Sequence, residues 1–242
     1  MPRFFTEPSN IDGSGIRITG SDVNHIKNVL RMRIGQEISV SDGAGHDYFG
    51  KIRSIDRDCV MIDIENSWDS YVELPAKITL FQGLPKADKM ELIIQKAVEL
   101  GACAVVPVLT KRTIVKWDEK KQDKKLARWQ GIAESAAKQS GRGIIPAVTA
   151  PVSFASALAQ AKQMEAAIIP YEKAKGMAAA RETVHSMRGK KSIGVFIGPE
   201  GGFDASEVDA AIKAGVCPIT LGRRILRTET AGLTALSILM FE

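Results

Sequence analysis

Buried strands and amphipathic helices alternate along most of this chain, and this alternation most constrains the fold. Apolar runs at residues 78–81, 104–109 and 166–170 are typical of strands, and residues 90–100 carry apolar side chains at helical spacing before Gly101. Because parallel strands need a crossover between them, usually a helix, the pattern predicts an α/β domain with a parallel sheet. Further strands are predicted at residues 193–197 and 217–221, and further helices at residues 126–139, 205–214 and 229–239.

The N-terminal part of the chain has a different pattern. Three short alternating segments, residues 36–41, 47–55 and 59–65, are separated by turns rich in Gly and Asp. One helix is predicted before them, capped by Ser21 or Asp22, with an apolar stripe of Val23, Ile26, Val29 and Leu30. Short strands at this spacing predict a small β-barrel. We therefore expect two domains, at residues 1–71 and 72–242.

Composition narrows the class of protein. No segment approaches the roughly 20 apolar residues that a membrane span needs, and the N-terminus lacks the apolar region of a signal peptide. A net charge of +5 is compatible with a polyanionic partner. The cysteines and histidines do not have the spacing of a metal site. They are Cys59, Cys103, Cys217, His25, His46 and His185. We expect a soluble, cytoplasmic protein without a metal.

A glycine-rich segment, Ile197-Gly198-Pro199-Glu200-Gly201-Gly202, joins a predicted strand to a helix that Asp204 or Ser206 could cap. Its glycines allow a ligand to approach the backbone closely. A phosphate loop is one alternative, but residues 196–209 hold no basic residue and Glu200 would repel a phosphate. The residues alone leave open a plain structural turn and a loop that binds a ligand without phosphates.

Two other segments also follow predicted strands. Residues 221–231 contain three arginines, an unusual composition for a connector, and Thr228 could cap the last helix. Residues 168–172 end a strand at Pro170, which cannot continue a central ladder. Ligands of open α/β sheets bind at the carboxyl ends of the strands, so all three segments are candidates for a ligand site.

Several motifs together carry a resemblance to a known family. They are MPRFF at residues 1–5, HIKNVLRMRIGQE at 25–37, LPKADKMELIIQKAVELG at 84–101, QSGR at 139–142, IGPEGGF at 197–203 and LGRRILRTETA at 221–231. In this order and spacing the sequence resembles, across essentially its whole length, the RsmE family. These are the 16S ribosomal RNA (uracil(1498)-N(3))-methyltransferases of the SPOUT superfamily.

The resemblance implies an N-terminal PUA-like RNA-binding β-barrel, a C-terminal SPOUT α/β domain with a trefoil knot and a parallel sheet, and a homodimer. It implies S-adenosylmethionine as the cofactor and 16S rRNA of the small ribosomal subunit as the substrate, methylated at N3 of uridine 1498 (m3U1498). The implied cofactor residues lie in three loops. They are Ile169, Pro170, Ile197, Gly198, Pro199, Glu200, Gly202, Leu221, Gly222, Leu226, Thr230 and Ala231.

For the chemistry that this family likeness implies, four residues are candidates. Uracil N3 carries a proton at neutral pH, so its methylation calls for a base or for a group that stabilises the anionic ring. Arg142 and Arg227 are candidates for stabilising the anion, and Glu200 and Glu229 are candidate bases. A structural role for Glu229 in the first turn of the last helix is about equally favoured.

Basic residues are the candidates for RNA contacts, by charge and by family likeness. They are Arg3, Arg17, Arg31 and Arg33 in the barrel and Lys86 and Lys89 near the cleft. Two positions depart from the family pattern, since Lys138 and Lys111 stand where acidic residues are common. Two rival functions stay open: another SPOUT methyltransferase, acting on ribose 2′-OH or another base, and a non-catalytic RNA-binding assembly factor.

Overall fold

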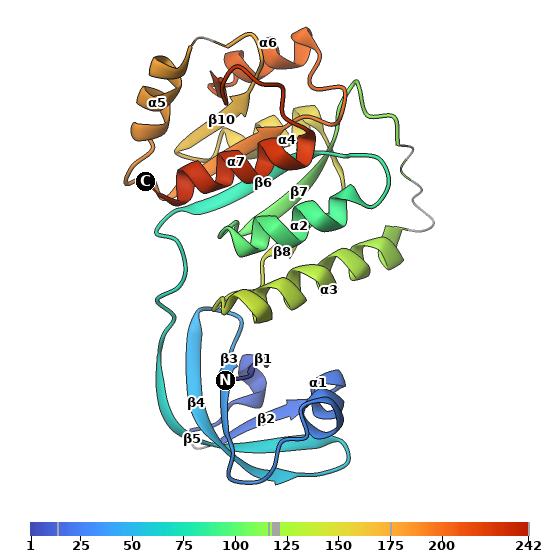
Figure 1. Ribbon diagram of the computed structural model, residues 1–242, viewed down its shortest axis with the longest axis vertical. Coiled ribbons are helices and arrows are strands. Elements are labelled where there is room, and N and C mark those ends of the chain that lie inside the picture. Colours follow the sequence, from blue (N-terminus) through green and yellow to red (C-terminus); the bar gives the residue numbers. More distant parts are fainter. Residues whose placement is uncertain (14, 116, 118–121, 175, 242) are drawn as a thin grey trace. The chain divides into compact units, whose positions relative to one another are not determined.

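The computed structural model describes residues 1–13, 15–115, 117, 122–174 and 176–241 (Figure 1). These residues form two compact units. The first holds Met1–Glu73 together with Ala137–Ile145, and the second holds the rest. The sequence pattern did not indicate that Ala137–Ile145 groups with the N-terminal unit. The reason is that long-range contacts, such as the 2.9 Å hydrogen bond from Ser41 Oγ to the carbonyl of Gly143, leave no local signal.

The first unit is built on a curled five-stranded sheet (Figure 1). Its strands are β1 (Arg3–Phe5), β2 (Gly15–Thr19), β3 (Glu37–Ser41), β4 (His46–Ile55) and β5 (Cys59–Asp69), in the order β1-β3-β4-β5-β2. The hydroxyl of Thr6, just after β1, donates to the carbonyl of Arg17 on β2, which links the two ends of this order. Apolar side chains from the strands fill the interior of the curl, among them Phe4, Ile16, Ile38 and Ile62.

The predicted helix of this unit is short and irregular. A turn of 3-10 helix, η1 (Pro8–Asn10), precedes β2. After β2, the helix α1 (Ser21–Asn24) continues into the π-helical segment η2 (His25–Val29). Gly20 precedes α1 without a side-chain cap, so the capping prediction was wrong. Val29 is 64% exposed and Leu30 40%, so half of the predicted stripe faces outward. A π turn takes up an extra residue, and this shifts later side chains around the helix.

The second unit is built on a parallel sheet, as predicted. The strands are β6 (Lys77–Gly83), β7 (Ala104–Leu109), β8 (Ala147–Val148), β9 (Val152–Ser153), β10 (Ala166–Pro170), β11 (Ser192–Ile197) and β12 (Cys217–Ile219). Their order is β12-β10-β11-β6-β7-β8, with β9 also on β7, and every pair is parallel. The central strands are almost wholly apolar because both faces are covered.

Helices cover the two faces of this sheet. They are α2 (Lys89–Glu99), α3 (Gln122–Ser140), α4 (Phe154–Ala161), α5 (Met177–His185), α6 (Ala205–Lys213) and α7 (Thr228–Met240). On one face, α4 and α6 pack over Phe81 and Phe196, whose rings stack at 4.5 Å. On the other, α2 and α7 contact each other and α7 contacts β11. No helix within the described residues is long and apolar enough to cross a membrane.

Candidate functional site

A cavity of about 570 Å³ lies in the second unit where β10, β11 and β12 end. Three loops line it: residues 170–172, 197–203 and 220–228, the last joined by Ala231 on α7. Parallel strands present their carboxyl ends at one edge of the sheet, so loops far apart in sequence meet there. The structure thus brings together the three segments that the sequence singled out.

Most of the residues predicted for the cofactor lie in this lining. They are Pro170, Ile197, Gly198, Pro199, Glu200, Gly202, Leu221, Gly222, Leu226 and Ala231. Ile169 and Thr230 lie outside it: Ile169 is fully buried in the core, and Thr230 is exposed on α7. Lys89 and Arg112, which come from other parts of the chain, also line the cavity.

The second of the three lining loops, residues 197–203, is the middle loop. Its glycines are required by its tight turn. The N–H of Gly202 donates to the carbonyl of Pro199 at 2.8 Å, and Gly202 has a φ of 67°. A Cβ on Gly198 would lie 2.9 Å from Gly202 Cα, closer than side chains are found in proteins. On the neighbouring strand, a Cβ on Gly83 would lie 2.5 Å from the ring of Pro199. The loop therefore folds back on itself against β6.

Glu200 is held on one side of this loop by the start of α2. Its carboxylate accepts hydrogen bonds from the N–H of Lys86, at 3.1 and 3.4 Å, and lies 3.1 Å from Lys89 Nζ. Partial burial acts to raise the pKa of Glu200, but hydrogen bonds from its own backbone, from Lys89 and from Lys86 outweigh it, and the pKa is lowered. Glu200 is thus kept ionised, which makes it a poor proton acceptor.

On its other side the loop is held by the segment after β7. Arg112 donates to the carbonyl of Gly201 at 2.8 Å and lies 3.7 Å from Asp204. Next to it, the N–H of Lys111 donates to Glu207 at 2.8 Å, and Lys111 Nζ to Ser206. In the sequence, Lys111 stands out only as a departure from the family pattern. Its pairing across the sheet could not be found without the strand order.

Of the two capping predictions for the adjacent helices, one is confirmed and the other was wrong. Asp204 caps α6 in a capping box with Glu207, as the sequence allowed. Thr228 does not cap α7, because the capping position is Arg227, which has no side-chain cap bond. The Thr228 hydroxyl instead donates to the carbonyl of Gly198 at 2.6 Å and accepts from Gln82 Nε2 at 2.9 Å. It ties the last loop to the middle one.

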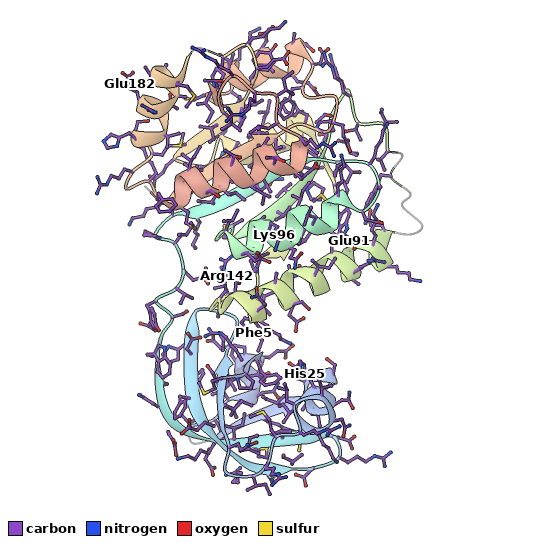
Figure 2. The ribbon with its side chains drawn as sticks, in the orientation of Figure 1. Phe5, His25, Glu91, Lys96, Arg142 and Glu182 are labelled. Carbon is purple, nitrogen blue, oxygen red and sulfur yellow. The ribbon has the colours of Figure 1, made fainter. Side chains whose placement is uncertain are left out.

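The four candidate catalytic residues are not all at the cavity. Arg227 and Glu200 line it. Glu229 is not among the lining residues. It lies in the first turn of α7, 3.6 Å from Lys89 Nζ, and its buried Oε2 accepts no hydrogen bond. Arg142 follows α3 in the first unit and is only 4% exposed (Figure 2). It pairs there with Glu73, its Nε donating to Oε1 at 3.2 Å.

The residues predicted to contact RNA differ in their surroundings. Arg17, Arg31, Arg33 and Lys86 are exposed, whereas Arg3 forms an ion pair with buried Asp47. Within the first unit, Lys138 lies 2.9 Å from Asp22, which explains how a lysine is accommodated at a position where the family pattern has an acid. No cluster of metal-ligating side chains is found among the described residues.

Comparison with known proteins agrees with this architecture. A sequence model of the RNA methyltransferase domain matches residues 72–240, and one of the RNA methyltransferase PUA domain matches residues 18–64. The ribosomal RNA small subunit methyltransferase E of Bacillus subtilis (strain 168) is 37% identical over 251 residues, covering 100% of this chain and 97% of the relative. The protein of the same name from Synechocystis is 31% identical, covering 97% of this chain and 76% of the relative.

Solved structures lead to the same family. The ribosomal RNA small subunit methyltransferase E from Neisseria gonorrhoeae, bound to S-adenosyl methionine, has a TM-score of 0.86 and 33% identity, covering 100% of this chain and 97% of the other. A structure from Legionella pneumophila with the bound cofactor SAM has a TM-score of 0.86 and 30% identity, covering 99% and 96%. This chain therefore belongs to the RNA methyltransferase family that includes the ribosomal RNA small subunit methyltransferases E.

Proposed function

We propose that this chain transfers the methyl group of S-adenosylmethionine to N3 of uridine 1498 in 16S rRNA of the small ribosomal subunit. The observation that carries the proposal is the cavity formed by three loops at the carboxyl ends of β10, β11 and β12. Relatives similar over the whole chain support it, since they are named for small-subunit rRNA methylation and two solved structures hold the cofactor.

The residues of the cavity fit this cofactor. A volume of about 570 Å³ is in the range usual for small-molecule sites, roughly 300–1,000 Å³. Leu221, Leu226 and Ile197 offer apolar walls for an adenine ring, and the carboxylate of Glu200, kept ionised, suits a cationic ligand. When bound, S-adenosylmethionine supplies an electrophilic methyl group on its sulfonium.

The chain's own residues have to bind the uracil ring and move its N3 proton. Arg227 lies in the cavity lining with its side chain exposed, and we assign to it the stabilisation of the anionic ring. Of the two candidate bases we favour Glu229. Its Oε2 accepts no hydrogen bond and lies 3.6 Å from Lys89 Nζ, whereas Glu200 lies 3.1 Å from Lys89 Nζ and also accepts from the N–H of Lys86. Arg142 is assigned a structural role with Glu73.

The RNA would be held by basic groups outside the cofactor site. Arg17, Arg31 and Arg33 are exposed on the first unit, and Arg223 and Arg224 are exposed at the cavity. Such side chains bind phosphates and give an affinity that falls with salt. We also propose the trefoil knot, a cytoplasmic location and the homodimer that the family resemblance implies. Exposed apolar residues at the end of α7, including the 86% exposed Phe241, support the dimer.

The test is methylation of small ribosomal subunits, and separately of free 16S rRNA, from cells that lack this modification. Nucleoside mass analysis should find 3-methyluridine at position 1498 after incubation with the protein and cofactor. Recovery of 2′-O-methylated nucleosides instead would support the other SPOUT activity. Calorimetry that finds RNA binding but no binding of S-adenosylmethionine would support the non-catalytic assembly factor.

A further inference from the structure

The ammonium group of Lys89 lies between two carboxylates that belong to different elements. It is 3.1 Å from Glu200 Oε1 on the middle loop and 3.6 Å from Glu229 Oε2 on α7. The Lys89 side chain is 33% exposed and that of Glu229 only 16%. Both distances are within the range of ion pairs, and partial burial reduces screening by salt. Lys89 therefore already has two anionic partners inside the protein.

The backbone around Lys89 is shaped for this position. Lys89 is the first residue of α2, and the N–H of Lys86 binds the same carboxylate of Glu200. Between them Ala87 has a φ of 52°, a conformation that costs a residue with a side chain about 1 kcal/mol or more. The turn thus brings both a backbone donor and a side-chain cation to Glu200.

Other charges near Lys89 do not offer an alternative to the bridge. Two charged residues of α2, Glu91 and Lys96, are labelled in Figure 2. Glu91 pairs with Arg128, and Lys96 pairs with Glu99. The residue before α2 is Asp88, whose negative charge helps to raise the pKa of Arg128. Glu229 is the sole charged residue in the sequence of α7. Within the described residues, Lys89 is the one side-chain cation for which an ion pair with Glu200 or Glu229 is found.

We propose that Lys89 is a positioning residue and not an RNA phosphate contact. By bridging Glu200 and Glu229, it fixes the middle loop and the first turn of α7 to each other. The inference deepens the proposed function, on which it rests. If Lys89 bound a phosphate, the RNA would have to displace two carboxylates and leave the partly buried Glu229 without a cation, which is costly. The bridge instead orients the loop that binds the cofactor and the helix that carries the favoured base.

Three variants of the full-length protein separate the two roles. Lys89→Met removes the charge of the bridge and keeps most of the length of the side chain, and Lys89→Arg keeps the charge. Lys86→Met removes the neighbouring exposed cation but leaves the backbone N–H that binds Glu200. For each, calorimetry gives the Kd for S-adenosylmethionine at a series of pH values. Filter binding gives the Kd for 16S rRNA at a series of salt concentrations.

A bridge predicts that Lys89→Met weakens cofactor binding about three- to tenfold at pH 7, with Lys89→Arg close to wild type. Removing the cation also moves the pKa of Glu200 back up toward 4.5, so cofactor affinity should fall at a higher pH on acidification than in wild type. The dependence of RNA affinity on salt should stay unchanged. Lys86→Met should keep the cofactor Kd.

A phosphate contact predicts the opposite pattern, which would overturn the proposal. Lys89→Met would then keep the cofactor Kd and its pH dependence, and the slope of log Kd for RNA against log salt would fall by about 1. Equal cofactor losses in Lys89→Met and Lys86→Met would also overturn it, since loss of positive charge alone would explain both. If Lys89→Met fails to fold, Lys89→Gln takes its place. Failure of the proposed function shows differently, as wild-type protein that does not bind the cofactor.

Discussion

At the scale of single residues, the site depends on contacts that link one loop to another. Thr228 is the clearest case, because its hydroxyl joins the start of α7 to Gly198 and to Gln82 on β6. Its side chain is buried, so water cannot replace the lost partners if the hydroxyl is removed. The residue that looked like a helix cap thus stabilises the cofactor loop.

Thr228→Val should lower the free energy of unfolding by about 1–3 kcal/mol, because two buried hydrogen bonds lose their shared partner while the volume is kept. It should also weaken S-adenosylmethionine binding. Thr228→Ser, which keeps the hydroxyl, is the matched control and should lose much less. Urea unfolding and calorimetry measure both effects. A loss in Thr228→Ser with none in Thr228→Val would show that the methyl group matters and the hydroxyl does not.

Gly198→Ala should reduce cofactor affinity more than tenfold. The new Cβ would lie 2.9 Å from the Gly202 backbone, so the loop would have to open. Gly201→Ala is the comparison in the same loop, since its Cβ would lie 3.3 Å from Arg112 Cβ, a contact that a shift of a few tenths of an ångström would relieve. Calorimetry should therefore find a much lower affinity for S-adenosylmethionine in Gly198→Ala than in Gly201→Ala. The reverse order would contradict the turn geometry described above.

At the scale of elements, the last turn of α3 and the segment after it belong with the N-terminal unit. Glu73 binds both the Arg142 side chain and the N–H of Gly143, at 3.0 Å, and Lys138 binds Asp22 at the start of α1. These pairs hold a segment of the sequence far from residue 73 inside the first unit. They give Lys138 a structural role that the family pattern did not suggest.

Lys138→Glu should destabilise the first unit by about 1–2 kcal/mol, since it places two carboxylates together in a partly buried position. Asp22→Lys alone should do the same. The double variant restores an ion pair with the charges exchanged and should recover most of the loss. Thermal unfolding of the four proteins gives the coupling energy. Additive losses in the double variant would show that the pair is not coupled.

At the scale of the whole molecule, the cavity is lined entirely by residues of the second unit. Saturation with S-adenosylmethionine at about 100 times its Kd should stabilise that unit by about 2.7 kcal/mol. Hydrogen exchange should slow in the loops at 170–172, 197–203 and 220–228 and in the central strands. Exchange in β3, β4 and β5 should not change. Equal protection of both units would contradict a site confined to the second.

The parallel sheet could be predicted because its strands are short buried runs with clear ends. Residues 104–109 and 166–170 were predicted with the bounds that the structure has, and α2 differs by one residue at each end. The helices α4 and α5 and the strand β2 were not predicted, and a start signal for α4 was missed, since Ser153 caps that helix. The strand order was also beyond reach, because it depends on contacts between residues far apart.

The site was predicted in part for the same reason. Loops after strands are marked in the sequence by glycine, proline and arginine, so the three walls of the cavity could be named. The partners of Lys89, Arg112 and Arg142 could not be predicted, because each partner is distant in sequence from the residue it binds. The fold explains these pairings, and they changed the roles expected of Lys89 and Arg142.

The order of the elements along the chain has a consequence for synthesis. The last strand of the parallel sheet, β12, ends at Ile219, whereas the third wall of the cavity begins at Thr220 and includes Ala231. A nascent polypeptide on the ribosome has therefore made every strand of the sheet before it can complete the cofactor site. The pocket for the methyl donor therefore lacks one of its walls until α7 has emerged from the ribosome.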